Sequence, residues 1–212
     1  MSEPRRTQLE RSAATKQALI RAARELWGKR GYADVGTPEI AEAAGVTRGA
    51  MYHQFADKAA LFLAVIESVE QDVMVQLSEL VAAAAPDSAT AAIRIAADAW
   101  IKAAMEPEIR QLLLLDAPNV LGWEKFREVS QRYGVGMTEQ LLAAAMQAGE
   151  LKPRPVRPLA LMLLGALDEA AMYVANADDP AAAADETRGV VDDVIGALLT
   201  PAQPRSAARR KR

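Results

Sequence analysis

The stretch from Thr37 to Leu61, TPEIAEAAGVTRGAMYHQFADKAAL, restricts the fold of this chain more than any other part of it. Its pattern predicts two short helices joined by a tight turn, followed at once by the start of a longer helix. Pro38 fits the first turn of a helix, where its missing N–H has no partner to lose. Gly45 suits the left-handed residue that ends a helix, and Thr47 is a good N-cap for the next one. This arrangement is a helix-turn-helix.

The second of these short helices carries residues suited to contacts with DNA. In a helix-turn-helix, the first residues of the second helix face base edges, while flanking polar groups hold phosphates. Arg48 can read guanine or hold a phosphate, and Gly49 lets the backbone approach the groove floor. Tyr52 and His53 present hydrogen-bonding groups one turn later. Asp57 is the expected N-cap of the next helix, and Lys58 directly after it adds a cation near the same backbone. The candidate DNA-binding residues are Thr37, Thr47, Arg48, Gly49, Tyr52, His53 and Lys58.

Longer helices are predicted on both sides of this motif. Thr15 is a suitable cap for a helix that ends at Gly31 and has apolar residues at helical spacing. Met51 and Phe55, spaced by four, should point into the core that this helix shares with the motif. From Asp57 to about Ala85 no Gly or Pro interrupts an apolar stripe, and about 29 residues at ~1.5 Å each give a rod of roughly 44 Å. This rod is long enough to link the motif mechanically to a second domain.

The segment GVTRGAMYHQFADKAAL resembles the tetracycline-repressor (TetR) family of bacterial transcription regulators, and ALIRAARELWGKRGY upstream resembles that family's first helix. The resemblance covers roughly residues 15 to 65. It implies an N-terminal DNA-binding domain, a helical C-terminal body that binds a small molecule, and a homodimer joined through the final two long helices. The chain departs from the family pattern at Gly36 and Thr37, where the family usually has Ser or Thr followed by an aliphatic residue. Either residue can therefore cap the helix.

The charge of the chain is divided unevenly along its length. Residues 1–60 hold ten Lys/Arg and seven Asp/Glu, residues 61–200 hold ten and twenty-one, and residues 201–212 hold five and none. A basic end on an acidic body suits a protein that meets DNA with one face only. The absence of cysteine excludes disulfides, thiolate metal sites and cysteine nucleophiles, and it fits a reducing, cytoplasmic location.

The remaining sequence predicts an all-α fold of about nine helices, because no useful stretch has the period of a strand. Gly and Pro separate the helices of the body. Its predicted helices are 93–105, with a start at Ser88 or Thr90, then 108–116, 122 or 123 to 149, 158–177 and 181–199. The last two are rich in Ala, Gly and Leu, and a large apolar face without a mate in a small domain indicates a mate on a second subunit. Two-fold symmetry then implies a near-palindromic operator.

An effector pocket is expected between Trp100 and Tyr173, where large apolar residues and a few polar ones gather. Each residue has an ordinary alternative, since apolar side chains usually form core and lone polar ones usually cap helices or face solvent. The candidates are Trp100, Met105, Leu112, Leu115, Asp116, Asn119, Trp123, Phe126, Tyr133, Met137, Glu169, Met172 and Tyr173.

Other classes of protein fit the sequence less well. An enzyme is disfavoured because the only histidine, His53, falls in the predicted recognition helix, and no phosphate-binding loop or dinucleotide turn is present. A DNA-packaging protein would need a basic body, whereas residues 61–200 are acidic. A helical adaptor that does not bind DNA would have no need of Arg48, Gly49, Tyr52 and Lys58 together. The longest apolar run, residues 159–167, is far short of the ~20 residues that cross a bilayer. No cofactor or metal site is predicted.

Four regions follow from these observations: a flexible basic arm at 1–14, a helix-turn-helix domain at 15–60, a helical ligand-binding and dimerisation domain at 61–200, and a disordered basic tail at 201–212. The arm either reaches an adjacent minor groove or is a solvated tail. The hypothesis is a homodimeric repressor that a small-molecule ligand releases from its operator. Activation by the same fold, or repression without a ligand, stays open.

Overall fold

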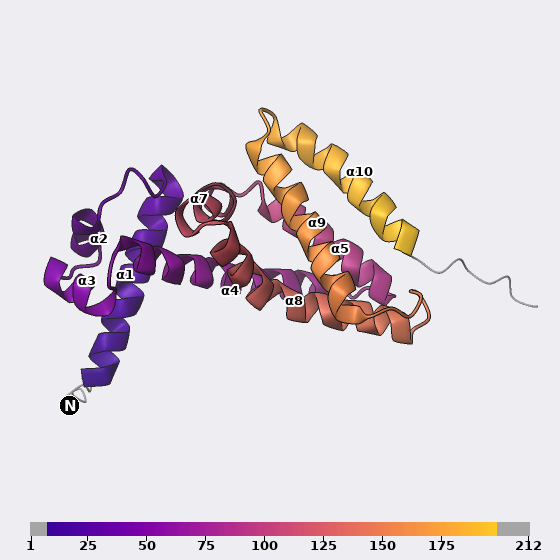
Figure 1. Ribbon diagram of the computed structural model, residues 1–212, viewed down its shortest axis with the longest axis horizontal. Helices are drawn as coiled ribbons and strands as arrows, with labels where there is room; N and C mark the ends of the chain where they lie inside the picture. Colours follow the sequence, from indigo (N-terminus) through magenta and orange to yellow (C-terminus); the bar gives the residue numbers. More distant parts are fainter. Residues whose placement is uncertain (1–7, 199–212) are drawn as a thin grey trace, which may run out of the picture.

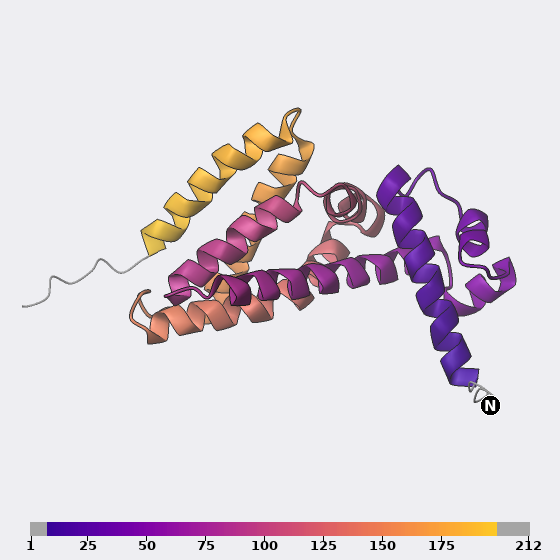
Figure 2. The same ribbon diagram turned by 180° about the vertical axis from the view of Figure 1, so that it is seen from behind.

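The computed structural model describes residues 8–198 and has two lobes (Figure 1). Three helices form the smaller lobe, and a long fourth helix runs from it into the larger lobe, as the view from behind also shows (Figure 2). The bounds of these helices are α1 Gln8–Arg30, α2 Thr37–Ala43, α3 Arg48–Gln54 and α4 Lys58–Ala84.

The larger lobe packs α4 against the helices that follow it. Three short elements run without a break from Pro107 to Leu121, so the described residues form nine helical units and no strand, as expected. The bounds are α5 Ala89–Ala103, α6 Pro107–Ile109, the π-helix η1 Arg110–Asp116, α7 Ala117–Leu121, α8 Trp123–Gln147, α9 Val156–Asn176 and α10 Pro180–Leu198.

Local capping explains where the helices of the motif begin and end. The hydroxyl of Thr47 accepts a hydrogen bond from the Ala50 amide at 3.1 Å, and the Asp57 carboxylate accepts one from the Ala60 amide at 2.7 Å. Gly45 has a φ of +67°, the left-handed value that a residue after a helix end favours. Gly36, not Thr37, occupies the N-cap of α2, and it makes no side-chain cap. The predicted caps at 47 and 57 are confirmed.

Two predicted boundaries were wrong. The first helix starts at Gln8, seven residues before Thr15, so residues 8–14 of the predicted arm are helical. The gap predicted between the helix 108–116 and the helix that starts at 122 or 123 is helical instead, because Ala117-Pro118-Asn119 begins α7. Pro118 stands near the start of α7, where the π-helix η1 passes into an α-helix. Residues 1–7 and the predicted basic tail lie outside the described residues.

An aromatic cluster holds the smaller lobe onto the start of α4. The ring of Trp27 lies 5.4 Å from Phe62 and 5.4 Å from Tyr32, and Tyr32 and Phe62 are 4.8 Å apart. Trp27 and Phe62 are fully buried, and the Trp27 indole donates to the Val35 carbonyl at 3.3 Å. Tilted and edge-on ring pairs of this kind add to the stabilisation from burial alone. The recognition motif is therefore fixed to α4 by core packing.

Polar contacts join the smaller lobe to the segment from Pro107 to Leu121. Arg24 on α1 makes two hydrogen bonds to the Glu108 carboxylate, at 2.8 and 2.9 Å, and it also pairs with Asp72 on α4. The Asp116 carboxylate accepts a hydrogen bond from the Tyr32 amide at 2.8 Å. A bidentate arginine pair fixes direction as well as distance. The orientation of the smaller lobe is thus tied to both α4 and the body.

Helix α9 is long and apolar enough to cross a membrane by length and composition alone. In this fold it contacts α5, α8, α10 and η1. Its buried residues include Ala160, Leu163, Ala171 and Val174. Only 28% of its apolar window is buried by these neighbours, so packing within this chain explains part of its apolar composition and leaves an apolar face at the surface.

Candidate functional site: a recognition helix and an acidic cavity

The outer surface of α3 is formed by the residues that the sequence singled out. Arg48, Gly49, Tyr52 and His53 are exposed, whereas Met51 is fully buried, as predicted. A Cβ at position 49 would meet nothing closer than the Thr47 hydroxyl at 3.9 Å. The protein itself therefore does not require glycine at this position, and the absent side chain leaves the tip of α3 flat.

Thr37 and Arg48 hold the Tyr52 side chain from two sides. The Tyr52 and Thr37 hydroxyls are 3.3 Å apart, and the Arg48 guanidinium lies 5.6 Å from the centre of the Tyr52 ring. Two hydrogen bonds lower the pKa of the Tyr52 phenol: the larger effect comes from Thr37 and the smaller from Arg48. Thr37 itself is only 8% exposed. The structure thus places Thr37 behind Tyr52, where it orients the phenol.

Lys58 turns toward the smaller lobe. Its Nζ donates to the Tyr32 carbonyl at 2.5 Å and lies 4.0 Å from the centre of the Tyr32 ring. Partial burial lowers the pKa of Lys58, and the carboxylates of Asp116 and Asp34 oppose that effect. Lys58 therefore joins the contacts between the motif and the body, and its predicted contact with phosphate stays a prediction.

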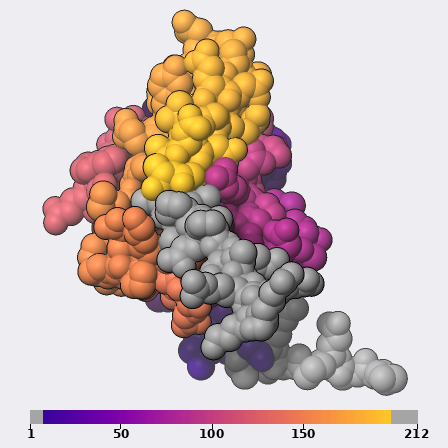
Figure 3. Space-filling model, turned by 90° about the vertical axis from the view of Figure 1, so that its right-hand side faces the viewer, coloured from indigo at the N-terminus to yellow at the C-terminus, as the bar shows by residue number. Residues whose placement is uncertain are grey.

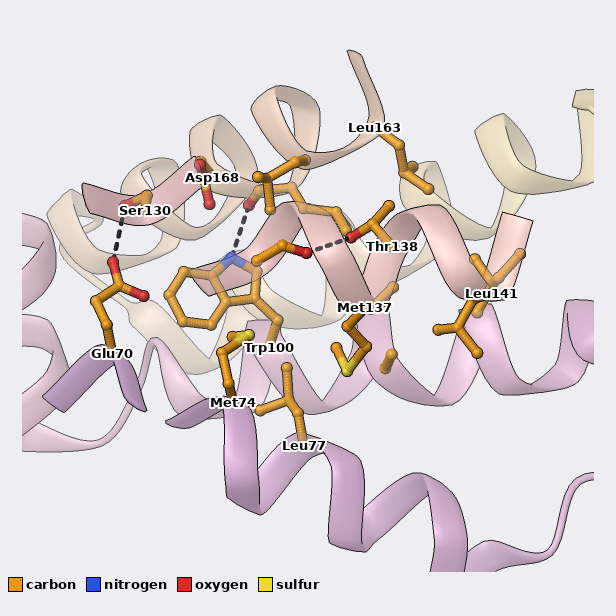
Figure 4. Close-up of a pocket in the computed structure, with 16 residues that line it drawn as sticks. Glu70, Met74, Leu77, Trp100, Ser130, Met137, Thr138, Leu141, Leu163 and Asp168 are labelled. Atoms are coloured by element: carbon orange, nitrogen blue, oxygen red, sulfur yellow. Dashed lines mark hydrogen bonds between the residues drawn. The ribbon is translucent and has the colours of Figure 1, made fainter. Parts of the chain in front are cut away.

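A cavity lies inside the body between α4, α5, α8 and α9 (Figure 4). Its volume is about 50 Å³, which is room for a few water molecules. Most of its lining is apolar, with Trp100 near the middle, and the Trp100 indole donates to the Leu167 carbonyl at 3.2 Å. An organic molecule entering this cavity must push its walls apart, and one of those walls is α4.

Polar side chains gather at one end of the cavity. Glu70 on α4 is 4% exposed, and its Oε1 accepts a hydrogen bond from the Ser130 hydroxyl at 2.8 Å. Asp168 on α9 faces the same end, as Figure 4 shows. Burial raises the pKa of Glu70, and the Ser130 hydrogen bond opposes that shift. Burial, aided by the charge of Glu70, raises the pKa of Asp168 to about 7, while Arg127 opposes it.

Two of the thirteen predicted pocket residues, Trp100 and Met137, line this cavity. Leu112 and Phe126 are buried core, Asp116 bonds to the smaller lobe, and Trp123 is half exposed. Glu169 and Tyr173 line a separate surface groove between α9 and α10. The cavity residues that the sequence did not single out include the following: Glu70, Met74, Ser130, Leu141, Leu163 and Asp168. One signal was available for Glu70, because it falls on the buried stripe of α4 between Ile66 and Val73.

The groove between α9 and α10 exposes large apolar side chains. Figure 3 looks at the end of the molecule away from the smaller lobe and shows α10 at the surface beside α9. Tyr173 is 57% exposed, Val190 63% and Val194 48%, and all three line the groove. Such a patch of neighbouring apolar residues is unusual on the surface of a monomer. No group of His, Asp or Glu suited to a metal ion occurs in the part of the chain that the structure describes.

Comparisons with known proteins agree with this architecture. The family described as "Bacterial regulatory proteins, tetR family" matches residues 19–65, and the "Tetracyclin repressor-like, C-terminal domain" matches residues 90–198. The HTH-type transcriptional regulator CymR of Pseudomonas putida is 45% identical over 67 residues, which are 32% of this chain and 33% of CymR. That similarity therefore spans about a third of each protein and is confined to one region.

Solved structures extend the likeness to the whole fold. A TetR-family transcriptional regulator from Pectobacterium atrosepticum is 29% identical, with a TM-score of 0.81 over 94% of this chain and 100% of that one. The regulator RolR, solved in complex with resorcinol, is 20% identical with a TM-score of 0.70 over 94% of this chain and all of RolR. A helix-turn-helix lobe with an exposed recognition helix, a helical body behind it and two matching family descriptions together place this chain in the TetR family of DNA-binding transcriptional regulators.

Proposed function

We propose that the protein is a homodimeric repressor in the cytoplasm, which holds a near-palindromic operator until a small molecule enters the cavity. The observation that carries this proposal is the course of α4. Asp57, the cap of α4, follows directly on the recognition helix, and Glu70 on the same helix lines the cavity. Thirteen residues at ~1.5 Å each separate the two points by roughly 20 Å. A displacement of α4 by a ligand would therefore reach the recognition helix.

The free energy for release comes from a difference in ligand affinity between two states of the protein. A ligand shifts this equilibrium only as far as it binds the released state more tightly. The small size of the cavity suits this scheme, because its volume of about 50 Å³ must grow before an organic molecule fits. The polar contacts of Arg24 and Asp116 would pass that change on to the smaller lobe. RolR, which shares the fold, binds the small aromatic molecule resorcinol.

The DNA-binding part of the proposal is tested by Arg48→Ala. The fragment to use is one recovered from the host genome by selection with the protein itself. We expect Arg48→Ala to weaken binding by roughly 1–3 kcal/mol, the loss typical of one arginine contact with base or phosphate. Retardation of the labelled fragment measures the effect at several salt concentrations. A contact with phosphate would also reduce the slope of log affinity against log salt by about 0.9, whereas a guanine contact would change it less.

Arg154→Ala is the matched control, because Arg154 is exposed in the loop between α8 and α9, outside the DNA-binding lobe. It should leave both affinity and salt dependence unchanged. If wild type and Arg48→Ala bind the fragment with equal affinity, then α3 is not the helix that recognises DNA.

The homodimer is proposed to form through the groove between α9 and α10. Val190→Asp places a charge in the centre of an apolar face, where burying it without a partner would cost several kcal/mol. We expect this variant to be monomeric and folded at micromolar concentration, as measured by sedimentation or light scattering. Val75→Asp is the control, since Val75 on α4 is 51% exposed and lies outside that groove. A Val190→Asp protein that stayed dimeric would place the interface elsewhere.

A further inference from the structure

The carboxyl end of the cavity has an unusual imbalance of charge. Glu70 and Asp168 both line the cavity, and no Lys, Arg or His is among its described lining residues. Glu70 uses one oxygen for Ser130, and neither its second oxygen nor the Asp168 carboxylate has a protein donor in the part of the chain that is described. These oxygens retain accepting capacity that the protein leaves unused.

The positive groups near these acids are turned to other partners. Arg127 on α8 acts against the rise in the pKa of Asp168, and the two residues line a small hollow next to the cavity. Arg127 does not line the cavity itself, and its guanidinium lies 5.6 Å from the centre of the Trp123 ring. Arg132 pairs with Glu67 and Glu128 at the surface. The cavity thus presents two carboxyl groups without a compensating cation inside it.

The rest of the cavity complements this acidic end. Trp100 stands next to the carboxyl groups, and the far end is mainly aliphatic and thioether, as Figure 4 shows. The one hydroxyl labelled there, that of Thr138, donates to the Gly134 carbonyl at 3.0 Å. Indole rings attract cations, most strongly where water is excluded. Aliphatic side chains favour an apolar body. An anionic ligand would find no Lys, Arg or His among the described lining residues, and its charge would oppose ionisation of both carboxyl groups.

From this arrangement we infer that the effector is an apolar molecule with one cationic group, such as a protonated amine, which sits between Glu70, Asp168 and Trp100. The inference rests on the proposed function, because it assigns a ligand class to the proposed effector cavity. The ammonium group would donate hydrogen bonds to the oxygens that lack donors, and the apolar body would reach toward Leu141 and Leu163. Its charge would also favour the ionised forms of both carboxyl groups.

Proton release on binding follows from the same contacts. In the empty cavity Asp168 holds a proton up to about pH 7, because its pKa lies well above the ordinary value of 3.8. A cation beside it favours the carboxylate, so binding should release protons near pH 7 and should tighten as the pH rises from 6 to 8. A neutral ligand would produce neither effect.

The experiment compares three molecules that share one body: 2-phenylethylamine as the cation, 2-phenylethanol as the neutral analogue and 3-phenylpropionate as the anion. Calorimetry on the full-length protein at pH 7, in two buffers of different ionisation enthalpy, gives affinity and proton release without DNA. We expect the amine to bind at least tenfold more tightly than the alcohol, with proton release, and the anion to bind most weakly. Equal or tighter binding of the alcohol or the anion, or no binding of the amine, would overturn the inference.

Three variants locate the effect in the cavity. Glu70→Gln keeps the shape and the Ser130 hydrogen bond, Asp168→Asn acts on the other helix, and either should reduce the preference for the amine at least fivefold. Glu79→Gln is the control, because Glu79 is an exposed acid on the same helix as Glu70. A thermal melt checks that each variant is folded. If Glu70→Gln does not fold, the comparison rests on Asp168→Asn alone. A preference that survives both changes would contradict the assignment.

Retardation of the selected genomic fragment by the same protein separates this inference from the proposed function. If the amine fails while another small molecule releases the fragment, the ligand class is wrong and the ligand-released repressor stands. If the protein does not bind specific DNA at all, the proposed function fails whatever the cavity binds.

Discussion

Replacing Gly49 with leucine is expected to abolish specific DNA binding while the protein stays folded. A side chain at this position starts in open space, since the nearest atom to a Cβ added there is the Thr47 hydroxyl at 3.9 Å. Gly49 is exposed at the tip of α3, so a leucine there would project toward the groove floor that the backbone must approach. We expect a loss of roughly 100-fold in affinity, equivalent to about 2.8 kcal/mol. Fragment retardation measures the affinity, and a thermal melt measures the stability.

The control for this change is Gly136→Leu. Gly136 is an exposed glycine within α8, and a Cβ there would meet no atom within 4 Å. Both changes replace a helical glycine and should therefore leave the protein folded and, if anything, more stable. If Gly49→Leu binds the fragment as tightly as Gly136→Leu does, then the tip of α3 does not enter the groove.

The second large effect is expected from Asp168→Asn, which should stabilise the ligand-free protein above pH 7. The pKa of Asp168 rises from 3.8 to about 7 on folding, so the folded state binds more protons than the unfolded state between those values. Stability must then fall as the pH rises from about 4 to 7, and the whole penalty is present at pH 8. A pKa shift of this size lowers the free energy of unfolding by about 4 kcal/mol at most. Because the side chain is partly exposed, we expect Asp168→Asn to raise the free energy of unfolding at pH 8 by roughly 2–4 kcal/mol.

Urea unfolding at pH 4 and pH 8 measures this prediction. Asparagine resembles the protonated carboxyl group, so wild type and variant should be similar in stability at pH 4 and should diverge at pH 8. Asp87→Asn, at a position in the turn before α5, is the control and should change little. A wild-type protein that is as stable as Asp168→Asn at pH 8 would show that the Asp168 carboxylate is not held in an unfavourable site.

The two effects of Asp168→Asn point in opposite directions for stability and for function. The variant gains stability but should lose the preference for a cationic ligand. Residues that bind a ligand are often unfavourable for the empty protein, because the ligand supplies the interaction that the fold lacks. A half-buried acid without a protein donor is therefore informative about function in a way that an ordinary core residue is not.

The sequence predicted the recognition motif well because its signals are local. Thr47, Asp57 and Gly45 act on the backbone within a few residues of themselves, and their roles as caps and turn are confirmed. The start of α1 was misplaced because residues 8–14 have no apolar stripe: Leu9 is their only large apolar residue and is 82% exposed, although the helix continues through them. Polar helical extensions of this kind leave little trace in hydrophobic periodicity.

The cavity could not be predicted in the same way because four helices meet to form it. Glu70 and Asp168 are 98 positions apart in the chain, and only the packing of α4 on α8 and of α8 on α9 brings both to one space. Phe126 and Leu112 were reasonable candidates because they are large and apolar, but both side chains are buried within the packed core. Which apolar residues leave a space is decided by tertiary packing, on which periodicity carries no information.

The central claim is that two copies of α3 enter the major groove of a near-palindromic site, and methylation interference on the selected fragment tests it most directly. Methylation of guanine N7 blocks contacts in the major groove without altering the phosphates. We predict two symmetrical clusters of interfering guanines, centred about one helical turn apart on one face of the duplex. A single cluster, or binding that is indifferent to methylation, would contradict the claim.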